Sequence, residues 1–320
     1  MVVVGGVTRL THSGLSIVEW QPLVGAVPPL DDAEWERTFA KYRETPEFRL
    51  RNHDMTLAGF KGIFWWEYAH RLLGRLVGVA FLLPFLYFLA KRRVDRALGW
   101  KLAAVFALGA LQGALGWYMV KSGLVDDPRV SQFRLAGHLG LAFAIYGAML
   151  WIALGLLGAA PAGRVAVPLR RLATALVAIV FVMVLSGALV AGIRAGFAYN
   201  TFPTMNGHLV PPEILMIDPW WKNFGYNMAT VQFDHRAIAW LLVILVPWAW
   251  GLSRRLDPSM SAARRWANAL LAMLAVQFTL GVVTLLNGVP LAAAALHQAG
   301  AVLVFTCAIG MRHSLGAQRA

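Results

Sequence analysis

The chain has 320 residues, of which 58% are hydrophobic and only 14% are charged, and its mean hydropathy is +0.59. Soluble domains carry about 25% charged residues, so this composition argues against a soluble enzyme and against a disordered chain. The net charge of +13 does not indicate nucleic-acid binding, because the charges lie between long apolar runs. The single cysteine, Cys307, excludes an internal disulfide, a CxxCH haem-attachment site and a cysteine-rich metal site.

Seven apolar runs are long enough to cross a bilayer as helices, which needs about 20 residues each. They are 63–90, 99–120, 135–157, 170–194, 236–253, 266–287 and 290–311. An eighth run starts at Met1 and is too short, so it is expected to be the outer half of a truncated first helix. The sequence therefore predicts an all-α polytopic membrane protein with eight transmembrane helices, the first one truncated.

The basic residues predict how these helices are oriented. Four connecting segments carry 14 Lys and Arg residues against two acidic ones: 91–101, 158–171, 254–265 and 312–320. Basic loops remain on the cytoplasmic side, or on the matrix side in an organelle. The long loops 19–62 and 195–234 should then face outwards, and segment 31–47 can form an amphipathic helix on that outer surface.

The two halves of the chain also repeat each other. The stretch 112–116 (QGALG) matches 277–281 (QFTLG) at an offset of 165 residues, and His70 matches His235 at the same offset. Near the start, Gly14 matches Gly196 at an offset of 182. Both copies run in the same sense, which predicts two tandem four-helix bundles related by a pseudo-two-fold axis along the membrane normal. The predicted halves are 1–160, which includes the long outer loop 19–62, and 161–320.

Four histidines are expected in the first turns of the even-numbered helices, all at one depth near the outer face: His70, His138, His235 and His297. Ionisable residues inside a membrane are costly and usually functional. Zinc would need three or four clustered ligands, whereas two histidines facing each other across a bundle supply the two axial ligands of a haem. The residues alone thus predict two haem sites, His70 with His138 and His235 with His297.

One carboxylate distinguishes the two sites. Glu67 precedes His70 by three residues, so both project from one face of the helix, and its repeat equivalent is Gln232. Glu67 is a candidate acid/base or charge-stabilising group beside a reacting haem. The competing interpretation is an interfacial carboxylate paired with Arg71 or Lys61.

The arginines that follow two of the histidines, Arg71 and Arg236, have two interpretations as well. Guanidinium groups match carboxylates, so these arginines are candidates for contacts with haem propionates. Exposed interfacial arginines fit the sequence equally well. Four other histidines are expected to be solvated or interfacial: His12, His53, His208 and His313.

Beyond these patterns, the sequence closely resembles the haem A synthase family over nearly its whole length. The resemblance is carried by WEYAHRLLGRLVG around His70, RLAGHLGLAF around His138, AGIRAGFAYNTFPTMNGHLVPP at 191–212, FDHRAIAW around His235 and LHQ at 296–298. The long first outer loop has no cysteine pair, as in the mitochondrial and alphaproteobacterial type.

The resemblance implies an oxidoreductase of the bacterial inner membrane that converts haem O into haem A for cytochrome oxidase biogenesis. Such enzymes oxidise the C8 methyl of haem O to a formyl group through successive hydroxylations. It further implies that His235 and His297 hold a haem b cofactor, that His70 and His138 belong to the substrate half, and that Glu67 matches the essential glutamate of the family. Haem O synthase and cytochrome oxidase assembly factors are the partners it suggests, while the electron donor and a homo-oligomeric state stay open.

Two other functions remain open on the sequence: a dihaem electron-transfer cytochrome and a haem carrier that hands on intact cofactor. Extraction of the pigments separates them, because only the enzyme converts haem O. The oxygen source is open too. A bis-histidine iron leaves no position for O₂, so either one histidine leaves during turnover or water supplies the oxygen.

Overall fold

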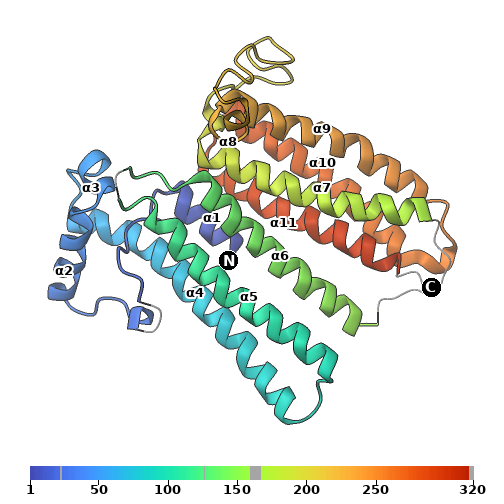
Figure 1. The fold of residues 1–320 in the computed structure, drawn as a ribbon, viewed down its shortest axis with the longest axis horizontal. Coiled ribbons are helices and arrows are strands. Elements are labelled where there is room, and N and C mark those ends of the chain that lie inside the picture. The colour runs from blue at the N-terminus through green and yellow to red at the C-terminus, as the bar shows by residue number, and fades with distance from the viewer. Residues whose placement is uncertain (22–23, 126, 159–166, 317–320) are drawn as a thin grey trace. The chain divides into compact units, whose positions relative to one another are not determined.

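The computed structural model describes residues 1–21, 24–125, 127–158 and 167–316, and Figure 1 shows that it is built from helices. No β-strand occurs in these ranges. The helices are α1 (Val2–Leu10), α2 (Asp32–Arg43), α3 (Pro46–Arg51), α4 (Leu57–Ala90), α5 (Arg96–Lys121), α6 (Gln132–Leu156), α7 (Val167–Gly192), α8 (Asn223–Tyr226), α9 (Met228–Ser253), α10 (Ser261–Leu286) and α11 (Leu291–Ser314). Short 3₁₀ turns lie at Val24–Ala26, Ala195–Phe197, Trp220–Lys222 and Pro258–Met260.

Seven of the described helices are long and apolar enough to cross a membrane, and they coincide with the seven predicted runs. They fit a multi-pass integral membrane protein. The eighth predicted run forms α1, which has nine residues and is about 14 Å long, too short for a bilayer core of about 30 Å.

Two of the long helices begin well before their apolar runs because polar residues cap them. The Thr56 side chain accepts a hydrogen bond from the backbone N–H of Gly59 at the start of α4. The Asn227 side chain does the same for Ala229 and Thr230 at the start of α9. Such caps satisfy N–H groups that have no partner within the helix. As a result His70 lies more than three turns inside α4 and not in its first turns, whereas the other three histidines lie within about two turns of a helix start.

The contacts divide the chain into two compact units, Met1–Leu141 (unit 1) and Ala142–Ala320 (unit 2). Helix α6 contributes residues to both. The predicted boundary between residues 160 and 161 lies outside the described residues, as do Arg164 and Arg319 of the predicted basic segments.

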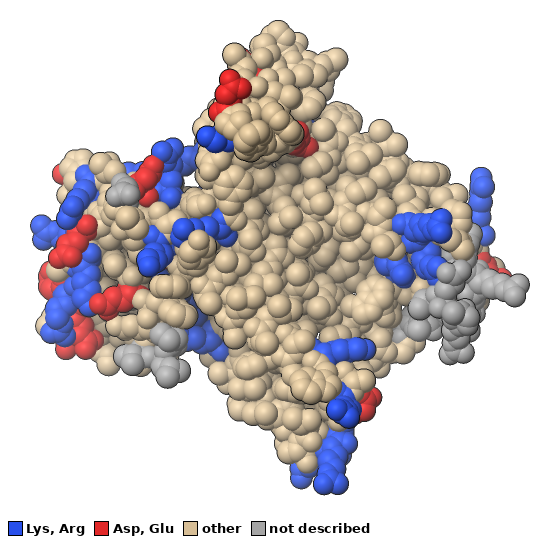
Figure 2. All heavy atoms as spheres, in the orientation of Figure 1, with Lys and Arg blue, Asp and Glu red and all other residues tan. Residues whose placement is uncertain are grey.

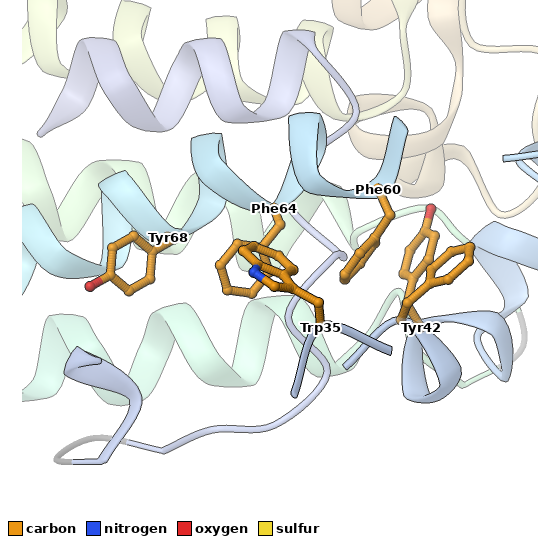
Figure 3. Close-up of a cluster of buried hydrophobic side chains, with 6 residues drawn as sticks. Trp35, Tyr42, Phe60, Phe64 and Tyr68 are labelled. Atoms are coloured by element: carbon orange, nitrogen blue, oxygen red, sulfur yellow. The ribbon is translucent and has the colours of Figure 1, made fainter. Parts of the chain in front are cut away.

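In unit 1, α4 packs against α1, α2 and α5. The first turns of α4 and the inner face of α2 share a cluster of buried aromatic rings (Figure 3): Trp35, Phe39, Tyr42, Phe60, Phe64 and Tyr68. The Trp35 and Phe64 rings meet edge to face with centroids 4.9 Å apart, a favourable arrangement for aromatic pairs. This cluster attaches the segment that contains α2 to α4.

The predicted amphipathic segment 31–47 is helical but consists of two helices. Helix α2 starts where the Asp31 carboxylate accepts from the Glu34 N–H, and α3 starts at Thr45 with Pro46 in its first position. Proline removes a backbone hydrogen bond from the interior of a helix but is well suited to the first position, which favours a break between α2 and α3. The apolar face of α2 is covered by α4.

In unit 2, four long helices close into a bundle. Helix α7 packs against α9 and α11, and α10 packs against α9 and α11 (Figure 1). Fully buried apolar side chains fill the middle, among them Leu176, Val246 and Leu270. Tyr146 from the second half of α6 adds a 2.7 Å hydrogen bond to Thr306 of α11.

Charged side chains are sparse along the long helices on the face shown in Figure 2. In unit 1, Lys and Arg gather at the turn between α4 and α5, whereas α2 and α3 carry both signs of charge. In unit 2, basic residues gather around the connection from α9 to α10. This distribution suits helices whose sides face lipid and whose ends face water.

Candidate functional site

The two histidines of unit 1 come from different helices and lie close enough that a charge on one affects the other. His70 projects from α4 and His138 from α6. Each imidazole is packed edge-on against a glycine of a neighbouring helix. A Cβ built on Gly5 of α1 would lie 2.8 Å from Cε1 of His70, and one on Gly116 of α5 would lie 2.9 Å from Cε1 of His138. Only glycine leaves room for these ring positions.

Unit 2 contains the same arrangement. His235 projects from α9 and His297 from α11, again close enough that a charge on one affects the other. A Cβ on Gly187 of α7 would lie 3.2 Å from Cε1 of His235, and one on Gly281 of α10 would lie 2.9 Å from Cε1 of His297. The four glycines are related by the sequence offsets of the repeat, Gly5 to Gly187 by 182 and Gly116 to Gly281 by 165.

A glutamine supports the second histidine of each pair. Gln112 donates from Nε2 to the backbone carbonyl of His138, and Gln277 donates to that of His297, each at 2.9 Å. These contacts hold the neighbouring helices in register at the depth of the imidazoles. Repeated glycines and glutamines thus give both histidine pairs equivalent surroundings within their own units.

Glu67 is 3% exposed, and four donors surround its carboxylate. Oε1 accepts hydrogen bonds from Nε and Nη2 of Arg71, at 3.1 and 2.6 Å. Oε2 accepts from the Ser16 hydroxyl and from the backbone N–H of Ile17, both at 2.8 Å. The sequence left Arg71 and Lys61 as alternative partners, and it is Arg71 that pairs with Glu67, while Lys61 lies 3.8 Å from Asp32.

The equivalent position in unit 2 carries an amide and no charge. Gln232 donates from Nε2 to the backbone carbonyl of Tyr199 at 3.2 Å. Ala198, at the position equivalent to Ser16, has no hydroxyl to offer. The carboxylate and the serine that holds it therefore differ together between the units.

Each arginine next to a histidine forms a hydrogen bond with a loop: Arg71 with the loop after α1, and Arg236 with the loop after α7. Arg71 donates from Nη2 to the carbonyl of Ile17 at 2.8 Å, and Arg236 donates from Nη2 to that of Tyr199 at 2.9 Å. Ile17 and Tyr199 are related by the offset of 182. These protein partners occupy several guanidinium donors, and contact of either arginine with a haem propionate stays a prediction.

The remaining histidines do not join either pair. His12, His53 and His208 are exposed, as expected. His313 is only 8% exposed and meets the Trp151 ring edge to face at 4.8 Å. Of the two environments expected for it, the solvated one is therefore wrong, and the interfacial one stays a prediction. His313 is buried because α11 continues three residues beyond the apolar run 290–311 while still packed in unit 2.

Known proteins resemble the chain over almost its entire length. The family model described as cytochrome oxidase assembly protein, COX15-CtaA, matches residues 1–309. The chain belongs to the COX15-CtaA family. A heme A synthase from Nitrosospira multiformis is 62% identical over 99% of this chain and 90% of its own length. The heme A synthases of Nitrosomonas eutropha and Parvibaculum lavamentivorans are 56% and 47% identical, each over at least 97% of this chain.

The side chains suit the haem chemistry that membership of the COX15-CtaA family suggests. Each unit offers two imidazoles, the donor set of a six-coordinate haem. Within the described ranges no three His, Cys, Asp or Glu side chains converge as a zinc site would require. At Gly5, Gly116 and Gly281 a Cβ would lie within 3.0 Å of the ring and would force it to shift, and at Gly187 it would be a tight contact.

Several residues of this family member escaped the sequence reasoning. The sequence showed Gln112 and Gln277 only as part of the repeat. It did not single out Ser16, which bonds to Glu67, or Ser186, which bonds to His235. The offset of 182 was available as a signal, because it aligns Ser16 with Ala198 and Val4 with Ser186. The roles of Gly5 and Gly187 become visible only in the structure, where each packs against a histidine of a neighbouring helix.

Proposed function

We propose that the chain is a haem A synthase, which oxidises the C8 methyl of haem O to the formyl group of haem A through successive hydroxylations. The observation that carries this proposal is 62% identity to a heme A synthase over 99% of the chain. The asymmetry between Glu67 and Gln232 supports it independently, because two equivalent histidine pairs differ in one buried carboxylate. A pair of purely electron-transferring haems gives no reason for such a carboxylate.

In this proposal the two units have different tasks. His235 and His297 are the axial ligands of a haem b cofactor, and His70 and His138 bind the substrate haem O. When bound, haem b supplies electron-transfer chemistry. The glycines and glutamines around all four imidazoles set the positions of the rings, and Arg71 and Arg236 hold the outer loops against the helices that carry them.

Glu67 acts in this scheme as a fixed negative charge beside the substrate site. Its four donors match the four lone-pair sites of an ionised carboxylate. A charge held in place at low dielectric stabilises positive charge that develops on the methyl carbon during oxidation, without reorganisation. Because all its lone pairs are used, this role fits the hydrogen bonds better than that of a base that takes a proton from water.

The proposal includes the finer architecture expected from the sequence. It places the protein in the bacterial inner membrane, which the seven long helices cross. The two bundles are related by a pseudo-two-fold axis, the basic segments lie in the cytoplasm, and loops 19–62 and 195–234 lie outside. Haem O synthase is the expected source of substrate, and cytochrome oxidase assembly factors are expected to receive the product. Because the reaction removes electrons from haem O, it requires an electron acceptor if water supplies the oxygen, or O₂ together with an electron donor if O₂ does. The identity of this redox partner is not part of the proposal.

The test is chromatography of haems extracted from cells that make haem O and express this chain. Haem A should appear with the chain and be absent without it. Purified His235→Ala and His297→Ala variants should lose tightly bound haem b, because a methyl group cannot ligate iron. Unchanged haem O, or variants with full haem content and an unaltered low-spin spectrum, would overturn the function or the ligand assignment, respectively.

A further inference from the structure

Among the four imidazoles, only that of His235 has a hydrogen-bond partner at Nδ1 within the described residues. Nδ1 of His235 lies 2.8 Å from Oγ of Ser186 on α7. The Nδ1 atoms of His70, His138 and His297 are buried and have no hydrogen-bond partner among the residues that the structure describes. A further difference is at Nε2 of His138, which lies 3.4 Å from Nε2 of Gln112. The contact with Ser186 is therefore the difference between the first histidines of the two pairs, His70 and His235.

The second hydrogen bond of Ser186 fixes the direction of the first. Oγ of Ser186 lies 2.9 Å from the backbone carbonyl of Met183, one turn earlier on α7, and a carbonyl can only accept. The hydroxyl proton therefore points at Met183, and Oγ accepts from Nδ1–H of His235. A neutral imidazole protonated at Nδ1 has its lone pair on Nε2, the form that ligates a metal.

The repeat shows what replaces Ser186 in unit 1. Ser186 precedes Gly187, which packs on His235, and Val4 precedes Gly5, which packs on His70. Valine cannot accept a hydrogen bond, so the Nδ1–H of His70 has no equivalent support. The two units thus differ in how firmly the first histidine of each pair is held.

We infer that Ser186 is a positioning residue that strengthens His235 as an axial ligand, so that unit 2 retains its haem, while Val4 leaves the haem of unit 1 free to exchange. This inference rests on the proposed function, in which one haem is a resident cofactor and the other is a substrate that must leave as product. Hydrogen bonding to the distal N–H of a ligating histidine raises its basicity and orients its ring. Loss of such a partner typically costs 10–100-fold in metal affinity.

The experiment measures haem transfer from purified, haem-loaded protein to excess apomyoglobin, together with the midpoint potential of the haem. Ser186→Ala should speed loss of the unit 2 haem at least tenfold and raise its potential, since a less basic ligand stabilises the ferric state less. Ser253→Ala is the matched control, because Ser253 on α9 is buried and donates to the carbonyl three residues earlier, as Ser186 does, but does not contact any of the four histidines. Ser186→Thr retains a hydroxyl and should restore slow transfer.

The reciprocal variant, Val4→Ser, should slow the exchange of the unit 1 haem. Ser186→Ala and Ser253→Ala proteins with equal transfer rates and potentials would overturn the inference and leave the proposed function intact, because neither readout depends on haem A formation. A parent protein that binds no bis-histidine haem would overturn both.

Discussion

The Ser16 hydroxyl donates a 2.8 Å hydrogen bond to Oε2 of Glu67, from a loop position whose counterpart in unit 2 is Ala198. The same carboxylate oxygen accepts the Ile17 N–H, so the loop after α1 holds one side of Glu67 and Arg71 holds the other. The position of the charge therefore depends on the loop as well as on α4. Each group around Glu67 can be tested separately.

Ser16→Ala should lower haem A formation about tenfold while leaving the fold intact. A hydrogen bond to a charged group is worth roughly 1.5–3 kcal/mol, and the Ile17 N–H and Arg71 would still hold the carboxylate. The measurement is haem A yield per molecule of purified protein, with Ser13→Ala as control, since Ser13 is equally buried in the same loop but bonds to Thr11. Equal yields for the two variants would show that Ser16 has no role in positioning Glu67.

Glu67→Gln should cost on the order of 100-fold or more in haem A formation, as expected for loss of an electrostatic or acid–base group. The fold should tolerate it, because Gln232 occupies the equivalent position and donates to the carbonyl of Tyr199, whose counterpart is Ile17. Extracted haems should contain haem O or a hydroxylated intermediate, with haem b content unchanged.

The control for Glu67→Gln is Glu213→Gln, which removes an exposed carboxylate from the segment between α7 and α8 in unit 2. It should leave the yield of haem A unchanged. A normal yield from Glu67→Gln itself would leave Glu67 as an ion-pair partner of Arg71 with no part in the chemistry.

Gly281→Ala should displace the imidazole of His297 and weaken haem b binding. The new Cβ would lie 2.9 Å from Cε1 of His297, closer than real Cβ contacts, so the imidazole ring must move. Gly251→Ala on α9 is the control, since nothing lies within 4 Å of a Cβ at that position. The low-spin absorption spectrum and haem content of the purified variants decide the matter, and full haem content in Gly281→Ala would contradict the packing argument.

Cysteine labelling tests the orientation expected from the basic segments. With Cys307 replaced by alanine, Asp32→Cys and Arg93→Cys should react with a membrane-impermeant thiol reagent from opposite sides of the membrane. Both positions are exposed, one on α2 and one in the turn after α4. Labelling of Asp32→Cys and Arg93→Cys from the same side would refute the topology.

Much of the fold follows from the sequence because lipid imposes a length on apolar runs, and all seven long runs are helices. The ends of the helices were harder to predict from the sequence. Thr56 and Asn227 extend α4 and α9 through caps that apolar runs do not reveal. Segment 31–47 was expected to lie on a surface, yet its aromatic face packs against Phe60 and Phe64, since α4 presents an apolar start to it.

The candidate site was predictable where it uses residue types that are unusual in an apolar sequence. Four intramembrane histidines and one unmatched carboxylate, Glu67, stand out in an apolar chain. Hydroxyls and glycines do not, because Ser16, Ser186 and Gly5 are ordinary residues of helices and loops until a neighbouring helix brings an imidazole or a carboxylate against them. Packing between segments far apart in the sequence gives these residues their roles.

A last prediction concerns Glu47, which lies on α3 and is 2% exposed. The pKa of its carboxyl group is raised to about 7, chiefly by burial and to a smaller extent by the nearby charge of Glu67, against the lowering effects of the hydrogen bond from Tyr42 and the charge of Arg51. Asn52 completes the group by donating to the Tyr42 hydroxyl at 2.7 Å.

Because the folded-state pKa lies above the unfolded value of 4.5, proton binding stabilises the folded segment. That stability is fully present below pH 4.5 and is lost as the pH rises through about 7, with a maximum of roughly 3 kcal/mol for a shift of this size. Hydrogen-exchange protection factors, which correct for intrinsic exchange, should therefore fall for α2 and α3 between pH 5 and 8. Glu47→Gln should keep high protection across this range, whereas Glu44→Gln, which alters an exposed neighbour, should behave like the parent. A parent protein whose α2 and α3 protection does not change between pH 5 and 8 would show that Glu47 does not titrate there.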